Sequence, residues 1–439
     1  MRGVVMRSVG RVGFILVVLI FIGTLSTAWT QSLQVVEIGQ SYAGRPIVAH
    51  RFGGGPHKLV VVGATHGGAE RNTQVLSLQL IDWFRNHPED IPAGVELVII
   101  PLLNPDGDVL DVRQNARGVD LNRNMNTNLD ACPANDWSQS VFGAYGTQSN
   151  TGGEYADSEP ESRVIRSFLF DASGVIFLHS AAGLVFPAQC DDPIAIEMAQ
   201  VYAKAANYKY ARFWDLYPIT GGMHDWARGV ELPAIIPELI TGDEPEFAQN
   251  LAGVIAVMQQ ASQLLPPIAD RQEGNVRFIM PIWRYWKAYG VDRVGQPLGD
   301  YVVENGVYTQ HFANMSVQYD ATSWYANVQP LALDLPELTG DVVDVLDENT
   351  VIAFSQSRFI VHDAFAEYYV RIDGERILGW PTSAEYRVLQ GDESIYVQHF
   401  QYGSIAYDSQ RNAFVHQPVV WQLALQANLT SARQPLQLR

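Results

Sequence analysis

The sequence predicts an α/β domain followed by a smaller β-rich region. Apolar strand-like runs alternate with helical stretches from residue 33 to residue 265. Several of these runs are continuously apolar, as in Leu59-Val60-Val61-Val62, which is typical of strands covered on both faces. Beyond residue 266 the sequence becomes rich in aromatic residues and short strand-like segments. We therefore expect a mixed, mainly parallel sheet sandwiched by helices, followed by a smaller, duplicated β-rich module.

The elements of the α/β domain follow from the same periodicity. Strands are expected where short apolar runs lie between turn residues, and helices where apolar residues recur at helical spacing. The predicted strands are 35–38, 47–52, 59–63, 95–101, 174–178 and 233–240. The predicted helices are 70–87, 159–170, 194–206 and 244–265.

Length and charge limit the classes of function. The chain has 439 residues, which is too long for one ordinary core and favours two or three domains. The formal net charge of −18, with no basic domain to offset phosphate repulsion, argues against a nucleic-acid partner.

The N-terminus has the composition of a secretory signal. Arg2, Arg7 and Arg11 come before the apolar stretch 13–22, and Ser26-Thr27-Ala28 places small residues where a signal peptidase cleaves. We expect a signal peptide over residues 1–28 and a secreted, extracellular or cell-surface protein. The alternative is an uncleaved N-terminal anchor, because the apolar run is near the upper length for a signal. No second apolar run is long enough to cross a bilayer.

The chain has two cysteines, Cys132 and Cys190. An exported protein meets oxidising conditions, so a disulfide between them is expected, and two unpaired thiols are the alternative.

Four short segments carry the side chains of a metal-dependent hydrolase. Two imidazoles and a carboxylate can hold zinc and leave its fourth position open, a further carboxylate can move protons, and guanidinium groups can grip a substrate carboxylate. The segments are Thr65-His66-Gly67-Gly68-Ala69-Glu70, the stretch from Asn104 to Asn124, Phe177-Leu178-His179-Ser180 and Pro237-Glu238-Leu239.

In their order and context these segments resemble the zinc carboxypeptidases of the funnelin type, the group of carboxypeptidase A and the bacterial murein-peptide amidases. The resemblance covers roughly residues 35–265 and implies a carboxypeptidase-like fold with one zinc ion per chain. It implies that His66, Glu70 and His179 are the metal ligands. The family spacing is His-x-x-Glu, and here one more residue intervenes; we expect the paired glycines Gly67 and Gly68 to absorb it. The alternative role of Glu70 is electrostatic stabilisation of a helix N-terminus.

The resemblance also assigns the substrate-handling residues. Glu238 occupies the position of the general acid/base, and the pair Asn122-Arg123 that of the clamp for the terminal carboxylate of the substrate. A second arginine is expected to polarise the scissile carbonyl. Arg113 is the first choice, and Arg117 is the alternative.

Two residues further along the chain complete the expected site. Tyr217 resembles the mobile tyrosine that closes over substrate, four residues before a glycine pair. His224 lies two residues after that pair, where the family tunes its side-chain pocket, and an imidazole there favours acidic or polar side chains. We expect Ser158-Glu159-Pro160-Glu161 to cap and pack a helix rather than to take part in catalysis.

The C-terminal half contains an internal repeat. We expect a catalytic domain over residues 33–265, a linker over 266–276, two repeats at about 281–320 and 365–408 within a module of 277–416, and a tail over 417–439. The second copy, with Leu378-Gly379-Trp380-Pro381, resembles the LGFP repeats of bacterial surface proteins. That resemblance implies a cell-wall glycan as ligand, and a purely structural repeat is the alternative.

The sequence thus predicts a secreted zinc metallocarboxypeptidase that hydrolyses a peptide bond next to a free C-terminal carboxylate, with peptidoglycan stem peptides as a candidate substrate. The alternatives are a surface or cell-wall binding protein with an inactive peptidase domain, and a zinc-dependent amide deacylase. The side-chain preference, the L or D linkage, the ligand of the repeats and the oligomeric state do not follow from the sequence.

Overall fold

The computed structural model describes residues 33–418, except 144–145, 326, 332–337, 339, 355–356, 373, 391–392 and 409–412. The expected signal peptide at 1–28 and the tail from 419 onwards lie outside the described residues. No helix in the described part of the chain is both long enough and apolar enough to span a membrane.

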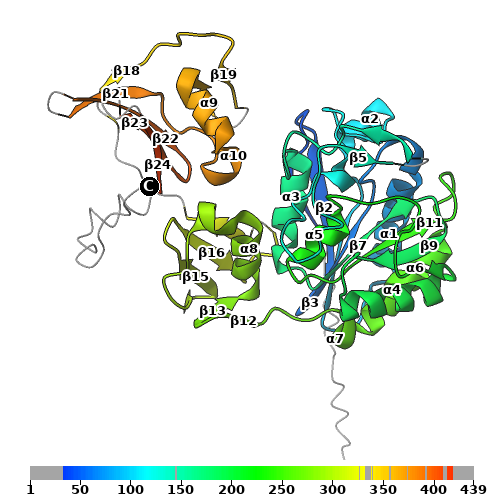
Figure 1. Cartoon of the computed structure of the whole chain (residues 1–439). Coiled ribbons are helices and arrows are strands. Elements are labelled where there is room, and N and C mark those ends of the chain that lie inside the picture. The colour runs from blue at the N-terminus through cyan, green and yellow to red at the C-terminus, as the bar shows by residue number, and fades with distance from the viewer. Residues whose placement is uncertain are drawn as a thin grey trace, which may run out of the picture. The chain divides into compact units, whose positions relative to one another are not determined.

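A nine-stranded sheet forms the centre of the first domain, and it confirms the predicted mixed, mainly parallel architecture (Figure 1). The order is β1-β2-β4-β3-β7-β11-β9-β10, with β8 paired to β11. The pairs β4–β3, β3–β7 and β7–β11 are parallel, whereas β1–β2, β2–β4 and β11–β9 are antiparallel. The strands are Gln34–Gln40, Pro46–Gly53, His57–Val62, Val95–Ile100, Gly174–Phe177, His179–Ser180, Leu184–Pro187, Lys209–Tyr210 and Ala234–Leu239 for β1–β4 and β7–β11.

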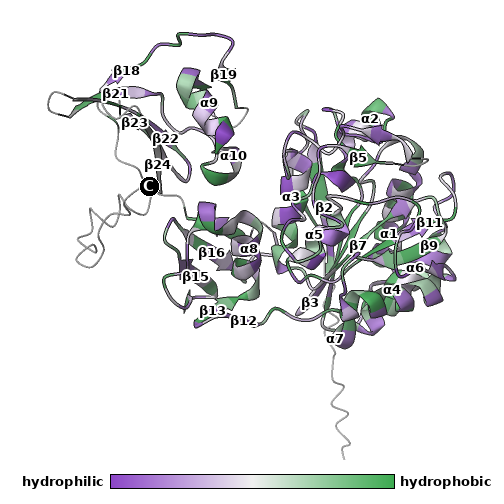
Figure 2. Ribbon diagram, viewed as in Figure 1, coloured by the Kyte–Doolittle hydropathy of each residue, from purple (hydrophilic) through white to green (hydrophobic). Residues whose placement is uncertain are grey.

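Helices cover both faces of this sheet. Val60 and Val62 of β3 pack in a core with α3 (Pro160–Phe168) and α5 (Met223–Gly229), while Leu59 and Val61 pack with α1, α4 and α6. The bounds of the latter three are Asn72–Asn86, Pro193–Ala206 and Phe247–Gln259. The alternation along β3 explains why its sequence is continuously apolar, and Figure 2 shows hydrophobic residues along the central strands.

Shorter elements connect these layers. They are α2 (Pro105–Leu110), α7 (Ala261–Leu264), the small strands β5 (Val141–Phe142) and β6 (Gln148–Ser149), and 3-10 turns that include Gly68–Glu70 and Leu121–Arg123. The single helix predicted over 244–265 is two helices, α6 and α7.

The predicted capping role of residues 158–161 is wrong. Helix α3 begins at Pro160, and its N-cap residue Glu159 makes no side-chain capping hydrogen bond. Glu159 and Glu161 are fully buried and bond to other segments of the domain instead. The predicted packing role does hold.

The predicted disulfide is present between Cys132 and Cys190, whose Cα atoms are 6.1 Å apart. It joins two loops that are 58 residues apart in the sequence.

Two modules follow, and each combines a helix with an antiparallel sheet. The first contains β12 (Asp270–Glu273), β13 (Val276–Ile279), α8 (Met280–Val294) and β14–β17, at Val302–Glu304, Val307–His311, Ser316–Asp320 and Val328–Pro330. The second contains α9 (Asp363–Arg371), α10 (Gly374–Ile377) and β18–β24, at Asp341–Val342, Val351–Ile352, Val361–His362, Tyr386–Gln390, Glu393–Phe400, Gly403–Asp408 and Ala413–Pro418. Strand β12 lies inside the segment expected to be a linker.

Equivalent residues of the two modules make equivalent contacts. Gln310 Nε2 donates to two main-chain oxygens at 3.0 and 3.3 Å, and Gln398 Nε2 does the same at 2.7 and 3.0 Å. An isolated bridge joins Pro297 to Phe312 in the first module and Pro381 to Phe400 in the second. Their surroundings differ, because the first module shares one hydrophobic core with the α/β domain whereas the second has a core of its own.

Candidate metal centre and substrate pocket

Neighbouring strands place the candidate residues at one edge of the sheet. His66 follows β3, His179 follows β7, and Glu238 lies near the end of β11, where it is paired with His179. The carboxyl ends of parallel strands meet at one edge, which is where open α/β sheets bind ligands. The structure therefore brings together residues from three distant parts of the chain.

The three predicted metal ligands form one buried cluster. The ligand atoms of His66, Glu70 and His179 all lie within 4.8 Å of one another. Nδ1 of His66 is 2.9 Å from Oε1 of Glu70, and Nδ1 of His179 is 3.0 Å from Oε2 of the same carboxylate. Burial lowers the pKa of His179 to about 4, so its ring is neutral near pH 7.

The extra residue between His66 and Glu70 does not separate the two side chains. Gly68 has a φ of 60°, in the left-handed region that glycine adopts without strain. A Cβ atom on Gly67 would lie 2.3 Å from the carbonyl of Gly107. Glycine at both positions lets the turn bring Glu70 back beneath His66.

Asp120 completes this centre, and the sequence reasoning missed its role. Its Oδ1 lies 2.9 Å from Nε2 of His66, while Nδ1 of the same ring faces a carboxylate oxygen of Glu70. Despite burial of the ring, these two carboxylates raise the pKa of His66, because a protonated ring can donate to both. A cation bound between Nδ1 and Glu70 would replace that second proton, and the His₂Glu donor set with a carboxylate behind one histidine fits zinc. The position of Asp120, two residues before Asn122 in the same segment, was the available signal.

Glu238 lies at the wall of a cavity of about 470 Å³, which is also lined by Glu70 and His179. Burial and the nearby Glu70 carboxylate raise the pKa of Glu238 to about 8. A carboxyl group in this environment can take up and release a proton near neutral pH.

Of the two candidate arginines, the structure places Arg113 in this cavity. Its Nη1 contacts Oε1 of Glu70, and its Nε donates to Oδ2 of Asp120 at 2.9 Å. Arg117 does not line the cavity and instead lies near Glu154 and over the ring of Tyr42.

Asn122 and Arg123 also line the cavity. Oδ1 of Asn122 accepts from the main-chain nitrogen of Met223 at 2.9 Å, which leaves its amide NH₂ group available to a ligand. Arg123 is buried, its Nη1 donates to the carbonyl of Asn122 at 2.8 Å, and its Nε has no hydrogen-bond partner. An arginine fork held in this way is suited to a carboxylate.

A second cavity of about 460 Å³ adjoins the first. The two share Phe186, Trp214, Leu216, Tyr217 and Ile219 in their linings, so Tyr217 borders both. Residue His224 lines the second cavity together with its neighbour Asp225, which the sequence reasoning did not single out. His224 is 2% exposed, and burial lowers the pKa of its ring.

A mixed sheet with a His₂Glu cluster, a nearby protonatable glutamate and an arginine clamp defines a metal-dependent peptide hydrolase of the carboxypeptidase type. The comparison with protein families agrees, since the chain matches the zinc carboxypeptidase model, Peptidase_M14, over residues 18–244, slightly more than half of its length. The chain belongs to this zinc carboxypeptidase family. All nine candidate site residues lie within the matched range.

Individual relatives are distant. The chain is 27% identical over 231 residues to Carboxypeptidase SOL1 of Arabidopsis thaliana, which covers 44% of this chain and 43% of that protein. The chain thus spans less than half the length of this curated relative. Among solved structures, bovine thrombin-activatable fibrinolysis inhibitor in complex with tick carboxypeptidase inhibitor has 17% identity and a TM-score of 0.45, covering 53% of this chain and 91% of that one. The murein-tripeptide amidase MpaA of Escherichia coli O157 has 19% identity and a TM-score of 0.39, covering 51% and 91%.

Proposed function

We propose that this chain is an active, exported zinc metallocarboxypeptidase that cleaves the last peptide bond of a substrate with a free C-terminal carboxylate. The observation that carries the proposal is the composition of the first cavity. It combines two metal donors, a glutamate with a pKa raised to about 8 and an asparagine–arginine pair.

In this proposal the substrate enters with its terminal carboxylate on Arg123 and the amide of Asn122. Both groups are held by main-chain contacts, so they need little reorganisation on binding. Tyr217, which borders both cavities, covers the bound substrate and excludes water. The side chain of the last residue extends toward His224 in the second cavity.

His66, Glu70 and His179 would hold zinc, which when bound supplies Lewis-acid polarisation and makes water easier to deprotonate. Glu238 accepts the proton from the attacking water and then delivers it to the leaving amine. Arg113 donates to the carbonyl oxygen as negative charge develops there. In this role it would turn part of its hydrogen bonding from Glu70 to the substrate.

The finer substrate class in this proposal is the peptidoglycan stem peptide. The support is the sequence of the second repeat, which resembles LGFP repeats of bacterial surface proteins, and the signal-like N-terminus. An exported peptidase with repeats that bind cell-wall glycan would act on peptides attached to that wall.

The test is an assay of the purified protein with zinc quantified. The substrates are N-blocked dipeptides with free carboxylates, the same dipeptides with amidated C-termini, and soluble stem peptides. Stoichiometric zinc with hydrolysis of the free-carboxylate dipeptides alone supports the carboxypeptidase. Hydrolysis of stem peptides in preference to dipeptides supports the wall substrate. Equal hydrolysis of amidated substrates would favour an amide deacylase, and absence of both zinc and turnover would favour an inactive binding protein.

A further inference from the structure

The segment 115–124 carries the candidate clamp and has an asparagine at each end. Asn115 and Asn124 are 2% and 0% exposed, so both amides must find their partners inside the protein. Between them lie Asp120, which bonds to His66, and the clamp residues Asn122 and Arg123. Whatever fixes the two asparagines therefore fixes the clamp.

Asn115 links the turn of this segment to helix α3. Its Oδ1 accepts from the main-chain nitrogens of Arg117 at 3.0 Å and Val119 at 3.1 Å, which holds the turn closed. Its Nδ2 donates to Oε2 of Glu159 at 2.7 Å and to Oε2 of Glu161 at 3.2 Å. The Oδ1 atom of Asn115 thus holds the turn closed, and its Nδ2 atom ties the turn to the two glutamates at the start of α3.

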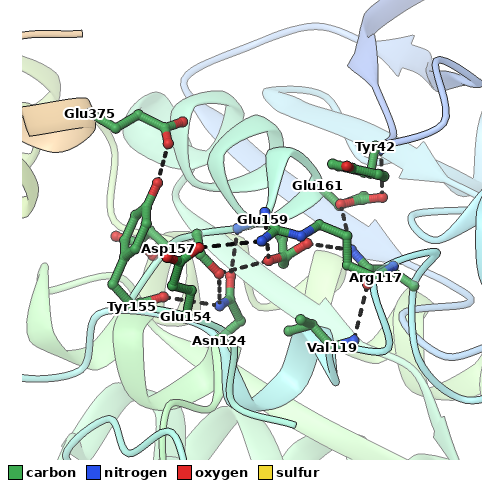
Figure 3. Close-up of polar contacts among 12 residues, drawn as sticks. Tyr42, Arg117, Val119, Asn124, Glu154, Tyr155, Asp157, Glu159, Glu161 and Glu375 are labelled. Atoms are coloured by element: carbon green, nitrogen blue, oxygen red, sulfur yellow. Dashed lines mark hydrogen bonds and ion pairs between the residues drawn. The ribbon is translucent and has the colours of Figure 1, made fainter. Parts of the chain in front are cut away.

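The side chain of Asn124 is held by hydrogen bonds to the turn that leads into α3 and to the segment just before that turn. Its Nδ2 donates to Ser158 Oγ at 2.9 Å, to the carbonyl of Gly152 at 2.9 Å and to that of Tyr155 at 3.3 Å. Its Oδ1 accepts from the main-chain nitrogen of Glu159 at 3.1 Å. Glu159 therefore contacts one asparagine through its side chain and the other through its backbone, as Figure 3 shows for the Asn124 side of the network.

The burial of Glu159 costs free energy unless hydrogen bonds satisfy both oxygens of its carboxylate. The residue is 0% exposed, and the nearest cationic atom is Nη1 of Arg117 at 3.8 Å, beyond hydrogen-bond distance. Its oxygens accept from neutral groups, Ser158 Oγ at 2.7 Å and Asn115 Nδ2 at 2.7 Å. A carboxylate accepts these bonds more strongly than a neutral amide would, which stiffens the connection.

We propose that Glu159 is a positioning residue for the substrate-carboxylate clamp. Its carboxylate accepts directly from Asn115 and is linked to Asn124 through the hydroxyl of Ser158. Through these contacts it fixes the place of Asn122 and Arg123 and, through Asp120, the orientation of the metal ligand His66. It touches neither substrate nor metal. This inference rests on the proposed function for its kinetic consequence, while its structural consequence can be measured independently.

The experiment compares Glu159→Ala and Glu159→Gln with the wild type and with Ser162→Ala. Ser162 lies on the same helix, is 0% exposed, and its hydroxyl has no hydrogen-bond partner, so it is a matched control for buried truncation. The measurements are kcat and KM on free-carboxylate and amidated dipeptides, zinc affinity, and hydrogen–deuterium exchange of the peptides covering 115–124.

The expected result for Glu159→Ala is a loss of roughly 10- to 100-fold in kcat/KM on free-carboxylate dipeptides, mostly through KM, because a clamp displaced by about 1 Å binds poorly. Zinc affinity should fall about 10-fold, as for loss of other groups behind a metal ligand. Exchange across 115–124 should be faster, and Glu159→Gln should restore most of each property because its amide oxygen still reaches Asn115.

Unchanged exchange and unchanged zinc affinity in Glu159→Ala, relative to Ser162→Ala, would overturn the inference even if the enzyme had no measurable turnover. So would an equal fall in kcat/KM for both alanine variants. A wild type that is inactive on every substrate would instead contradict the proposed function, and the exchange and zinc results would still decide the role of Glu159.

Discussion

The metal centre and the seam between the α/β domain and the first module both bury charged side chains, but the hydrogen-bonding groups of the two regions are satisfied to different degrees. We define the seam as Lys58, Asp171, Arg284 and Asn327. Arg284 is 3% exposed and donates to four main-chain oxygens, of Val230, Phe170, Ala172 and Glu231, at 2.6–3.1 Å. Lys58 donates to Asp171 at 2.7 Å and to the carbonyl of Trp324 at 2.9 Å, and Asn327 contacts the second oxygen of Asp171.

The metal centre and the adjoining cavity leave buried polar atoms without partners. These are Nε2 of His179, Nε of Arg123, Nδ1 of His224 and Oδ2 of Asp225. Buried polar groups are normally satisfied, and each exception in a native protein calls for a reason. At the seam, hydrogen bonds satisfy the buried charged groups and hold one packing arrangement in place, whereas the site retains donor and acceptor atoms that a bound substrate could use. Substitutions in the two regions should therefore separate activity from stability.

The largest effect should come from Glu238→Gln, which keeps the shape of the side chain and removes its ability to accept a proton. We expect kcat to fall by about 10³- to 10⁴-fold, near the upper range for loss of a general acid/base. The melting temperature and zinc content should not fall below wild-type values, because the buried site already favours the neutral form of Glu238 and a neutral amide is no costlier to bury. Steady-state kinetics with metal analysis is the measurement, and full activity in the variant would exclude Glu238 from catalysis.

Arg284→Met should lower the stability of the protein and leave its activity unchanged, the opposite of the result expected for Glu238→Gln. The substitution keeps the volume at the seam but leaves four carbonyls without their donor, and we expect a loss of about 3–5 kcal/mol in the free energy of unfolding. The activity of the remaining folded protein at 25 °C should be unchanged, since Arg284 does not line either cavity.

Calorimetry and urea unfolding measure this effect. Arg277→Met is the control, because Arg277 lies in the same module but is exposed, and its ion pairs are long, at 3.7 and 3.8 Å. It should change stability by at most about 0.5 kcal/mol. If Arg284→Met were as mild as the control, the hydrogen bonds of Arg284 would not contribute to the packing of the first module on the α/β domain.

Replacing Cys132 and Cys190 by serine tests whether the disulfide between them supports both stability and activity. Closing a loop of 58 residues stabilises a protein by about 4 kcal/mol in the chain-entropy model, and measured values are typically about 2–4. The two cysteines are close in sequence to Ala134 and Gln189, which line the second cavity. We therefore expect a lower melting temperature together with a KM raised by a few fold. A stability loss without any change in KM would show that the disulfide supports the fold alone.

The sequence predicted many residues of the candidate site but none of the seam, because the signals of the site are local. His66, Glu70, His179 and Glu238 stand next to the ends of apolar strands, where parallel topology brings them together. The clamp residues Asn122 and Arg123 share one short segment.

Other features depend on contacts between segments that are distant in the chain. The partnership of Asp120 with His66 spans 54 residues, and the bond from Asn115 to Glu159 spans 44. The pattern Ser158-Glu159-Pro160-Glu161 favoured a capping role, but the tertiary fold drew both carboxylates inward. Helix α8 was missed because its many aromatic residues give no clear apolar stripe and it packs against the α/β domain.

The smallest effect should follow from Glu375→Gln in the second module. Arg163 Nη1 is 3.0 Å from Oε1 of Glu375, and the hydroxyl of Tyr155 donates to its Oε2 (Figure 3). The pair is partly exposed, with 30% and 36% of the two side chains accessible, so the substitution should cost less than about 1 kcal/mol, and less still at high salt.

The contact nevertheless lies one hydrogen bond from the clamp segment, because the carbonyl of Tyr155 accepts from Asn124. If Glu159 alone fixes the clamp, Glu375→Gln should leave KM within about twofold of wild type, since the carboxylate anchor is untouched. The KM of the double variant, Glu375→Gln with Arg163→Gln, should be no higher than the KM of either single variant. A KM raised 10-fold by Glu375→Gln would instead mean that the second module helps to position the substrate clamp. Activity would then depend on a third region of the chain, beyond the metal centre and the contacts of Glu159.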